Sequence, residues 1–215
     1  MLQLPISPVS SARDRKSHPE PLWDEGKMGD AITHELATIV IATATILWAP
    51  EANGTELSEL LQKLNLSTYS RRTIPPDFDG HTVDNREMSL RSLQGKVVAL
   101  NFWATWCLEC RPEMPGFERL HREFSARGLV VIGINARETS ATIREYAKEL
   151  RLTFPLLLDD SGKINSTYGV IGLPTTFLID RDGRAVALAV GPRDWSGNPD
   201  RELIRALLGG TSAAK

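Results

Sequence analysis

Apolar and polar positions alternate in blocks along the second two-thirds of the chain. Residues 96–104 (KVVALNFWA) and 128–136 (GLVVIGINA) are continuous apolar runs, which is typical of strands buried on both faces of a sheet. The segment between them places large apolar side chains three and four residues apart, which predicts a helix over about residues 108–126. A buried strand, a helix and a second buried strand therefore follow one another.

The pattern continues to the end of the chain. It predicts a helix over 140–150 (SATIREYAKEL), a strand in 154–160 (FPLLLDD), a short helix before Gly169, a β-hairpin over 175–190 and a last helix over 199–210. This order predicts an α/β fold with a central mixed sheet, helices on both faces and a β-hairpin. We expect this domain to span residues 74–208, with a tail over 209–215.

The N-terminal part has a different composition. Residues 1–30 carry four prolines and mixed charge without an apolar period, so we expect them to be disordered. Residues 36–49 hold no charge, and a helix of this length is about 21 Å long, short of a hydrocarbon core of about 30 Å. The length fits the apolar part of a secretory signal. We therefore interpret residues 31–52 as an export signal or an uncleaved membrane anchor, with a buried helix as the alternative.

Residues 53–66 (NGTELSELLQKLNL) show a one-sided leucine period. They predict a short helix that Asn53 can cap, either a stalk or a helix packed on the domain, followed by a linker to residue 73.

Composition narrows the classes of function. Of 215 residues, 41% are hydrophobic and 24% charged, with a net charge of −2, so no basic field argues for nucleic acid as a partner. Two cysteines are too few for a disulfide framework. They leave one structural bridge or one redox pair.

Both cysteines, Cys107 and Cys110, lie directly after the first buried strand, where the helix is expected to begin. Free N–H groups and the helix dipole favour an anion there, which lowers the pKa of Cys107 and makes its thiolate the nucleophile. Cys110 is one turn further on and can resolve a mixed disulfide. We therefore predict an exposed, attacking Cys107 and a buried Cys110, with no cofactor beyond the redox-active disulfide.

Two other interpretations of this pair are weaker. A closed zinc site needs two further ligands, and the four histidines show no paired spacing. A static structural disulfide remains open, but a bridge over three residues closes a tiny loop and restrains little of the unfolded chain.

Several motifs in order resemble one family. The segments PPDF, LQGKVVALNFWATWCLECRPEMP, GLPTTFLIDRDG and GPRDW resemble the TlpA/ResA-like thiol–disulfide oxidoreductases, which have a thioredoxin fold, over about residues 74–208. The resemblance implies an exported or membrane-anchored enzyme of the periplasm or cell envelope. It further implies oxidised protein substrates, among them apocytochrome c or metal-site assembly factors, and an upstream membrane thiol reductase as electron donor.

The resemblance also implies roles for single residues. Pro174 is expected to be a cis-proline beside the dithiol, with the backbone of Leu173 offered to an extended substrate peptide, and Trp106 to shield the sulfurs and form an apolar docking surface. Glu113 matches an acidic residue that can hold the proton of Cys110, although a solvated glutamate at a helix start is the alternative. Asn101 stands at the position where thioredoxins share a buried aspartate. Because its side chain is an amide, this position cannot titrate in the present chain.

One position departs from the family pattern. Glu109 precedes the second cysteine, where proline is frequent, and its charge should disfavour the thiolate and help keep the pair reducing.

Two other functions compete with this interpretation. A peroxidase is the first, but the positions matching the upstream proline and threonine of peroxiredoxins are Leu100 and Ala104. A copper-binding or docking module is the second, and no cluster rich in methionine or histidine supports it.

Overall fold

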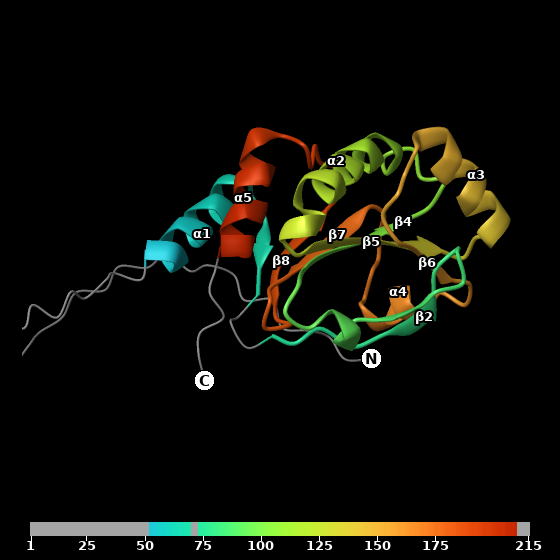
Figure 1. Cartoon of the computed structure of the whole chain (residues 1–215), viewed down its shortest axis with the longest axis horizontal. Helices are drawn as coiled ribbons and strands as arrows, with labels where there is room; N and C mark the ends of the chain where they lie inside the picture. Colours follow the sequence, from blue (N-terminus) through green and yellow to red (C-terminus); the bar gives the residue numbers. More distant parts are fainter. Residues whose placement is uncertain (1–51, 70–72, 210–215) are drawn as a thin grey trace, which may run out of the picture. The chain divides into compact units, whose positions relative to one another are not determined.

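The computed structural model describes residues 52–69 and 73–209 (Figure 1). The disorder predicted for residues 1–30 lies outside the described residues, as do the apolar segment up to residue 51 and the last six residues. Within the described part, no helix is long and apolar enough to cross a membrane.

A six-stranded mixed sheet forms the centre of the domain, with the strand order β1-β8-β7-β4-β5-β6. The central strand β4 pairs in parallel with β5 and antiparallel with β7. The strands are β1 (Ser67–Thr68), β4 (Val97–Trp103), β5 (Leu129–Ala136), β6 (Leu156–Asp159), β7 (Thr175–Ile179) and β8 (Ala185–Val190). A separate two-stranded sheet joins β2 (Asp79–His81) to β3 (Glu87–Ser89). The predicted mixed sheet and the β7–β8 hairpin are confirmed.

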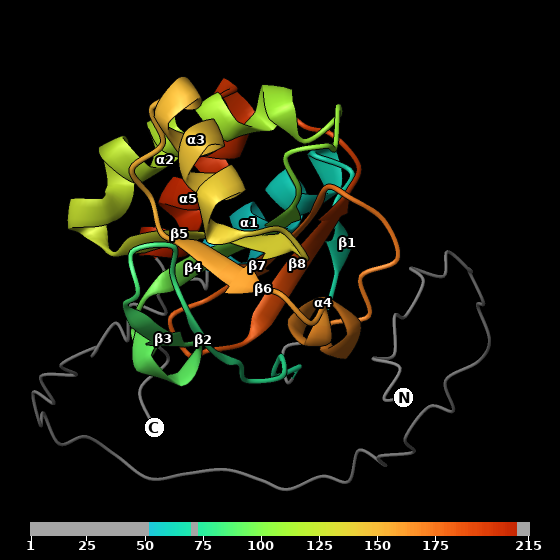
Figure 2. The ribbon, with the colours of Figure 1, turned by 90° about the vertical axis from the view of Figure 1, so that its right-hand side faces the viewer.

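Helices cover both faces of the sheet, as predicted. Figures 1 and 2 show α1, α2, α3 and α5 above the sheet and α4 with the β2–β3 hairpin below it. The α-helices are α1 (Ala52–Lys63), α2 (Met114–Phe124), α3 (Ser140–Leu150), α4 (Lys163–Thr167) and α5 (Asn198–Gly209), and the 3₁₀ helices are η1 (Arg91–Leu93), η2 (Arg111–Glu113) and η3 (Ser125–Arg127).

The side chains of β4 divide the core into two layers. All seven residues of the strand are buried, as the continuous apolar run predicted. Val97, Ala99 and Trp103 pack under α2 and α5, whereas Val98 and Leu100 pack on the other face. Successive strand residues point to opposite faces, so a strand covered on both sides needs apolar residues throughout. Asn101, on the α2 face, is the exception.

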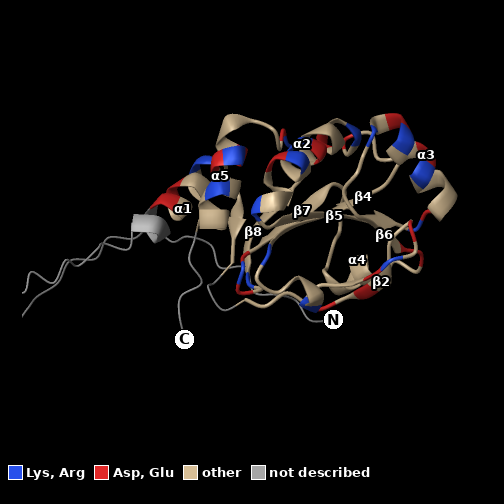
Figure 3. Ribbon diagram, in the orientation of Figure 1, with Lys and Arg blue, Asp and Glu red and all other residues tan. Residues whose placement is uncertain are grey.

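Charged residues lie mainly on the helices and loops around this core. Figure 3 shows Lys and Arg next to Asp and Glu on α2, α3 and α5, while the central strands are largely uncharged. The interspersed signs fit the small net charge of the chain.

The segment before residue 74 is more structured than the predicted linker. The strand β1 pairs with β8, with Ser67 opposite Leu188, and α1 packs against α5. Leu61 of α1 is 6% exposed within the core. The helix begins at Ala52, so Asn53 lies within α1. The leucine period that predicted the helix thus also joins it to the domain.

The helix after β4 begins later than predicted. Its first regular element is η2, and α2 starts only at Met114, six residues beyond the expected start. Pro112 and Pro115 have no N–H and cannot donate the bonds that a helix from residue 108 would need. Pro115 is tolerated in the first turn of α2, where no such bond is required.

Candidate active site

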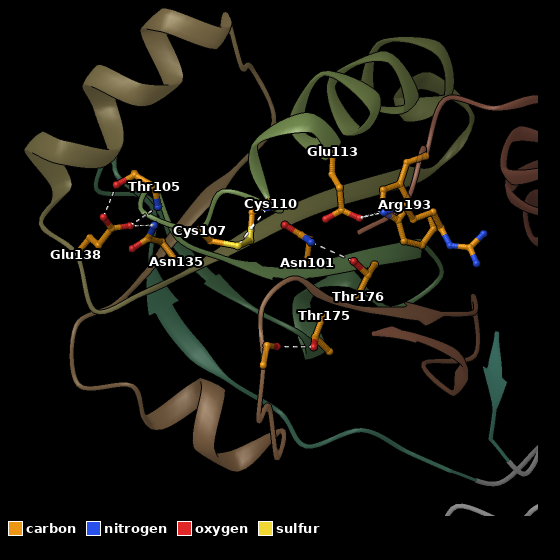
Figure 4. The surroundings of a disulfide bond; sticks show 12 residues. Asn101, Thr105, Cys107, Cys110, Glu113, Asn135, Glu138, Thr175, Thr176 and Arg193 are labelled. Carbon is orange, nitrogen blue, oxygen red and sulfur yellow. Dashed lines mark hydrogen bonds between the residues drawn. A yellow bond between two sulfur atoms is a disulfide. The ribbon is translucent and has the colours of Figure 1, made fainter. Parts of the chain in front are cut away.

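The two cysteines form a disulfide in the turn that connects β4 to η2 (Figure 4). The N–H of Cys110 lies 3.1 Å from the Sγ of Cys107, in the geometry of a hydrogen bond. Cys110 has no exposed surface and Cys107 is 7% exposed. Cys107 is therefore the more accessible cysteine, but the prediction that it is exposed is wrong for the disulfide form, in which it is buried.

Cys107 does not lie at a helix start, although the sequence predicted that it would. Cys107 lies in a turn, four residues before η2. In this turn the Cys107 N–H donates to the carbonyl of Ala104, and the Cys110 N–H donates to the carbonyl of Cys107. The Cys110 N–H is the donor that the helix start was expected to supply. After reduction, a hydrogen bond to a charged thiolate is stronger than one to a neutral sulfur, so it favours the ionised form of Cys107.

A loop with a cis peptide bond lies after α4. The Leu173–Pro174 bond is cis, as expected. Pro174 is buried, and its carbonyl accepts a hydrogen bond of 2.9 Å from the Gly191 N–H, which ties the loop to the end of β8. Thr175 Oγ1 donates to the carbonyl of Gly172 within the loop (Figure 4). Leu173 is half-buried.

Large apolar side chains are exposed in the dithiol turn and in the cis-proline loop. Trp106 is 67% exposed, Leu108 87% and Ile171 100%. Trp103, by contrast, is fully buried in the core. The exposure of Trp106 fits the docking surface predicted for it. Leu108 and Ile171 were not singled out by the sequence, because exposure of an apolar residue cannot be read from its type.

Glu113 is buried beside the late loop that follows β8, with 2% of its surface exposed. Its Oε1 accepts hydrogen bonds of 2.9 Å from the Arg193 N–H and from Trp195 Nε1 (Figure 4). Its Oε2 is buried without a partner among the described residues. Burial raises the pKa of Glu113 to about 7, against the opposing effect of the two hydrogen bonds and of the Arg193 charge. The alternative of a solvated glutamate is therefore wrong.

Asn101 projects from β4 on the side of the sheet that carries α2. Its Nδ2 donates a hydrogen bond of 3.0 Å to Thr176 Oγ1, and it is 1% exposed (Figure 4). Its Oδ1 has no partner among the described residues. The amide cannot titrate, whereas the Glu113 carboxyl has a pKa near neutral pH.

The sequence did not predict a set of hydrogen bonds that holds the turn before the cysteines. We call this set, formed by Glu138 with Thr105 and Asn135, the clasp. The Glu138 carboxylate accepts from the Thr105 N–H at 2.7 Å, from the Thr105 hydroxyl, and from Asn135 Nδ2 at 2.7 Å (Figure 4). A signal was present: Asn135 and Glu138 stand at the end of β5, which runs parallel to β4 with Trp103 opposite Asn135. The carboxyl ends of parallel strands meet at one edge of a sheet, where sites gather.

The fold and the geometry of this site define a class of proteins. A mixed sheet whose central strand leads into a C-x-x-C disulfide, opposite a cis-proline loop, is the arrangement of thioredoxin-fold proteins with a redox-active cysteine pair. Solved structures agree. A thiol:disulfide interchange protein of the thioredoxin family from Chlorobium tepidum superposes with a TM-score of 0.59 at 31% identity, covering 66% of this chain and 99% of that one.

The sequence comparisons give the family. The model of the AhpC/TSA family matches residues 72–187, so the chain belongs to that family. The thiol–disulfide oxidoreductase ResA of Bacillus thuringiensis is 40% identical over 111 residues, which are 52% of this chain and 64% of that protein. The thioredoxin-like protein YneN of Bacillus subtilis is 39% identical and covers 58% and 78%. The ResA-like resemblance is confirmed, although the chain spans less than two thirds of the length of that ResA.

Proposed function

We propose that the protein is an exported thiol–disulfide oxidoreductase that reduces disulfides in proteins of the cell envelope. The observation that carries this proposal is the Cys107–Cys110 disulfide, which lies in one site with the buried Glu113 carboxyl. The relatives named as thiol–disulfide oxidoreductases support the reaction class. Apocytochrome c and metal-site assembly factors are the substrate classes that the resemblance implies.

The chemistry starts from the reduced dithiol. The Cys107 thiolate attacks one sulfur of the substrate disulfide, and the other substrate sulfur leaves as a thiolate that takes up a proton. The Cys110 thiol then loses its proton and attacks Cys107 Sγ. This step forms the Cys107–Cys110 disulfide and releases the second substrate thiol. Two electrons pass to the substrate, and an upstream membrane thiol reductase returns two electrons and two protons to the pair.

On this proposal Glu113 takes up and returns the proton of Cys110. A carboxyl with a pKa of about 7 is partly ionised at neutral pH, so it can accept a proton and give it back. Its free Oε2 has lone pairs that no described residue uses. Glu113 thus acts as the general base for Cys110 when the mixed disulfide resolves, and as the general acid when the disulfide is reduced again.

Substrate binding falls to the exposed apolar residues and the cis-proline loop. Trp106 provides an apolar contact, and the backbone of Leu173 before the cis bond pairs with an extended substrate segment.

The residues of the site favour neither of the two competing functions. Leu100 and Ala104 are fully buried apolar residues, so the positions matching the peroxiredoxin proline and hydroxyl offer neither group. The described residues hold no group of three or more His, Cys, Asp or Glu side chains suited to a metal ion.

Trapping of a mixed disulfide tests the proposal. Cys110→Ala removes the resolving thiol, so we expect envelope proteins to remain disulfide-linked to Cys107 and to be released by a reductant. Cys107→Ala is the matched control and should trap nothing. The purified chain with both cysteines should also reduce the disulfides of insulin. A variant that traps through Cys110, or a reduced protein that binds copper without reducing insulin, would overturn the proposal.

A further inference from the structure

Arg193, in the loop between β8 and α5, connects three parts of the domain. Its backbone N–H donates to Glu113 Oε1 at 2.9 Å. Its Nη1 donates to Asp200 Oδ1 of α5 at 3.0 Å, and its Nη2 donates to the carbonyl of Leu64, just beyond the end of α1. The guanidinium also lies over the ring of Trp195, 5.7 Å from its centroid. Figure 4 shows Arg193 and Glu113 joined in this way.

The surroundings of these contacts are largely buried. The side chain of Arg193 is 20% exposed and that of Asp200 8%, and Trp195 is 1% exposed. A guanidinium held by a carboxylate, a carbonyl and an aromatic face has little freedom to move. Both donors to Glu113 come from this short loop, one from Arg193 itself and one from Trp195. The position of these donors therefore depends on where Arg193 is held.

We propose that Arg193 is a positioning residue through which α1 fixes the Glu113 carboxyl beside the dithiol. The helix α1 therefore contributes to the geometry of the site and is not only a spacer before the domain. The inference deepens the proposed function, since it rests on the proton role of Glu113. The α1 helix and the Arg193 loop both lie outside residues 72–187, the part that the family model matches.

The charges around Glu113 give the direction of the effect. Arg193 is the cation that acts on Glu113, Asp200 of α5 is paired with Arg193, and the cysteines of the dithiol lie on the turn before η2. The Arg193 charge and the two hydrogen bonds all lower the pKa of Glu113. Removing the guanidinium takes away a cation, loosens the donors and leaves Asp200 without its partner. Each of these changes favours the protonated carboxyl, so the pKa of Glu113 should rise.

The first test titrates the Glu113 carboxyl by ¹³C NMR in the oxidised full chain. For Arg193→Met we expect the midpoint to rise by about half a unit, a fraction of the 1–3 units that a direct ionic partner can give. Arg181→Met is the matched control. The Arg181 guanidinium is likewise held by several hydrogen bonds, to the carbonyls of Gly95, Arg127 and Leu208, and no hydrogen bond joins it to Glu113. It should leave the midpoint unchanged.

The second test addresses α1. Leu61→Ala loosens α1, so it should raise the Glu113 midpoint in the same direction as Arg193→Met. Ile164→Ala truncates a buried side chain of α4 on the other face of the sheet and should not. An unchanged midpoint in both Arg193→Met and Leu61→Ala would overturn the inference. This readout needs no substrate, so it is independent of whether Glu113→Gln changes the exchange rate, which decides the proposed proton role.

Discussion

Glu113 is the residue whose environment matters most to the proposed chemistry. Its carboxyl is taken out of water and given two donors on one oxygen and none on the other among the described residues. Desolvation outweighs the donors, so the pKa in the folded state is about 7, well above the ordinary 4.5. The folded chain therefore keeps a proton that the unfolded chain has already lost.

This difference makes stability depend on pH. The contribution of Glu113 is fully present below about pH 4.5 and is lost as pH rises through about 7, where the folded carboxyl also ionises. We predict that the free energy of unfolding of the oxidised protein falls over this window by up to about 3 kcal/mol more than that of Glu113→Gln. Urea unfolding from pH 4 to 9 measures it. The exposed Glu109→Gln is the control, and parallel curves for Glu113→Gln and the natural chain would contradict the prediction.

The same variant tests the proton role. Glu113→Gln keeps the size of the side chain and removes its titration. We therefore expect disulfide exchange to slow and the pH profile of its rate, from about pH 5 to 10, to shift. Overlapping profiles would leave Glu113 without a role in proton transfer, whatever its pKa.

At the scale of elements, the dithiol turn after β4 is held to the end of β5. The strands lie side by side in parallel, and Glu138 beyond β5 accepts two hydrogen bonds from Thr105 in the turn. Asn135, the residue opposite the last residue of β4, donates a third hydrogen bond to the same carboxylate. The clasp restrains the turn two residues before Cys107.

Glu138→Ala should loosen this turn. Three hydrogen bonds are lost, so we predict a loss of about 2 kcal/mol in the free energy of unfolding and a slower attack by Cys107. In Glu138→Gln the amide oxygen can still accept from the Thr105 N–H and from Asn135 Nδ2, which share one carboxylate oxygen, and the new Nε2 can donate to the Thr105 hydroxyl, so most of the loss should be restored. Urea unfolding and the rate of insulin reduction measure both effects. Glu145→Ala, an exposed residue of α3, is the control.

The clasp would have to be reinterpreted if Gln at position 138 were as damaging as Ala. In that case the negative charge, and not the hydrogen bonds, would be what the turn requires.

At the scale of the whole molecule, the chain joins an apolar N-terminal segment to a domain that carries the Cys107–Cys110 disulfide. The described domain reaches back to α1 and β1, which pack against α5 and pair with β8. Export is proposed from residues 36–49, whose uncharged sequence suits a signal or an anchor.

We predict that cells making the full chain place it in the envelope fraction. Replacing Ile41 and Ile46 by Lys puts two charges in the apolar segment, at a cost of about 2.5–3.5 kcal/mol each in a membrane centre, and should leave the chain in the cytosol. Ser10→Lys, outside the apolar segment, is the control. Fractionation with an antibody to the chain measures the outcome. A reduced, folded cytosolic product from the natural sequence would contradict export.

Local sequence determined most of the elements and the reactive pair. Continuous apolar runs predicted β4 and β5 because strands covered on both faces need apolar residues throughout, and the run DRDG between two apolar segments predicted the β7–β8 hairpin. Cys107 and Cys110 were identified by their spacing and their place after a buried strand. The start of α2 was misplaced, although Pro112 and Pro115 were visible, because the apolar period was given more weight than the missing N–H groups.

Only the tertiary structure decided what surrounds the cysteines. Thr105 and Glu138 are 33 residues apart, Glu113 and Arg193 80, and Leu64 and Arg193 129. Contacts over such separations depend on how the strands are ordered and how helices pack on them, and no local period encodes them. The burial that raises the pKa of Glu113 is likewise a property of the packed late loop and Trp195. A glutamate near a helix start is solvated or buried according to which segments pack over it. The tertiary fold of the whole chain determines these segments, so the local sequence does not predict the burial.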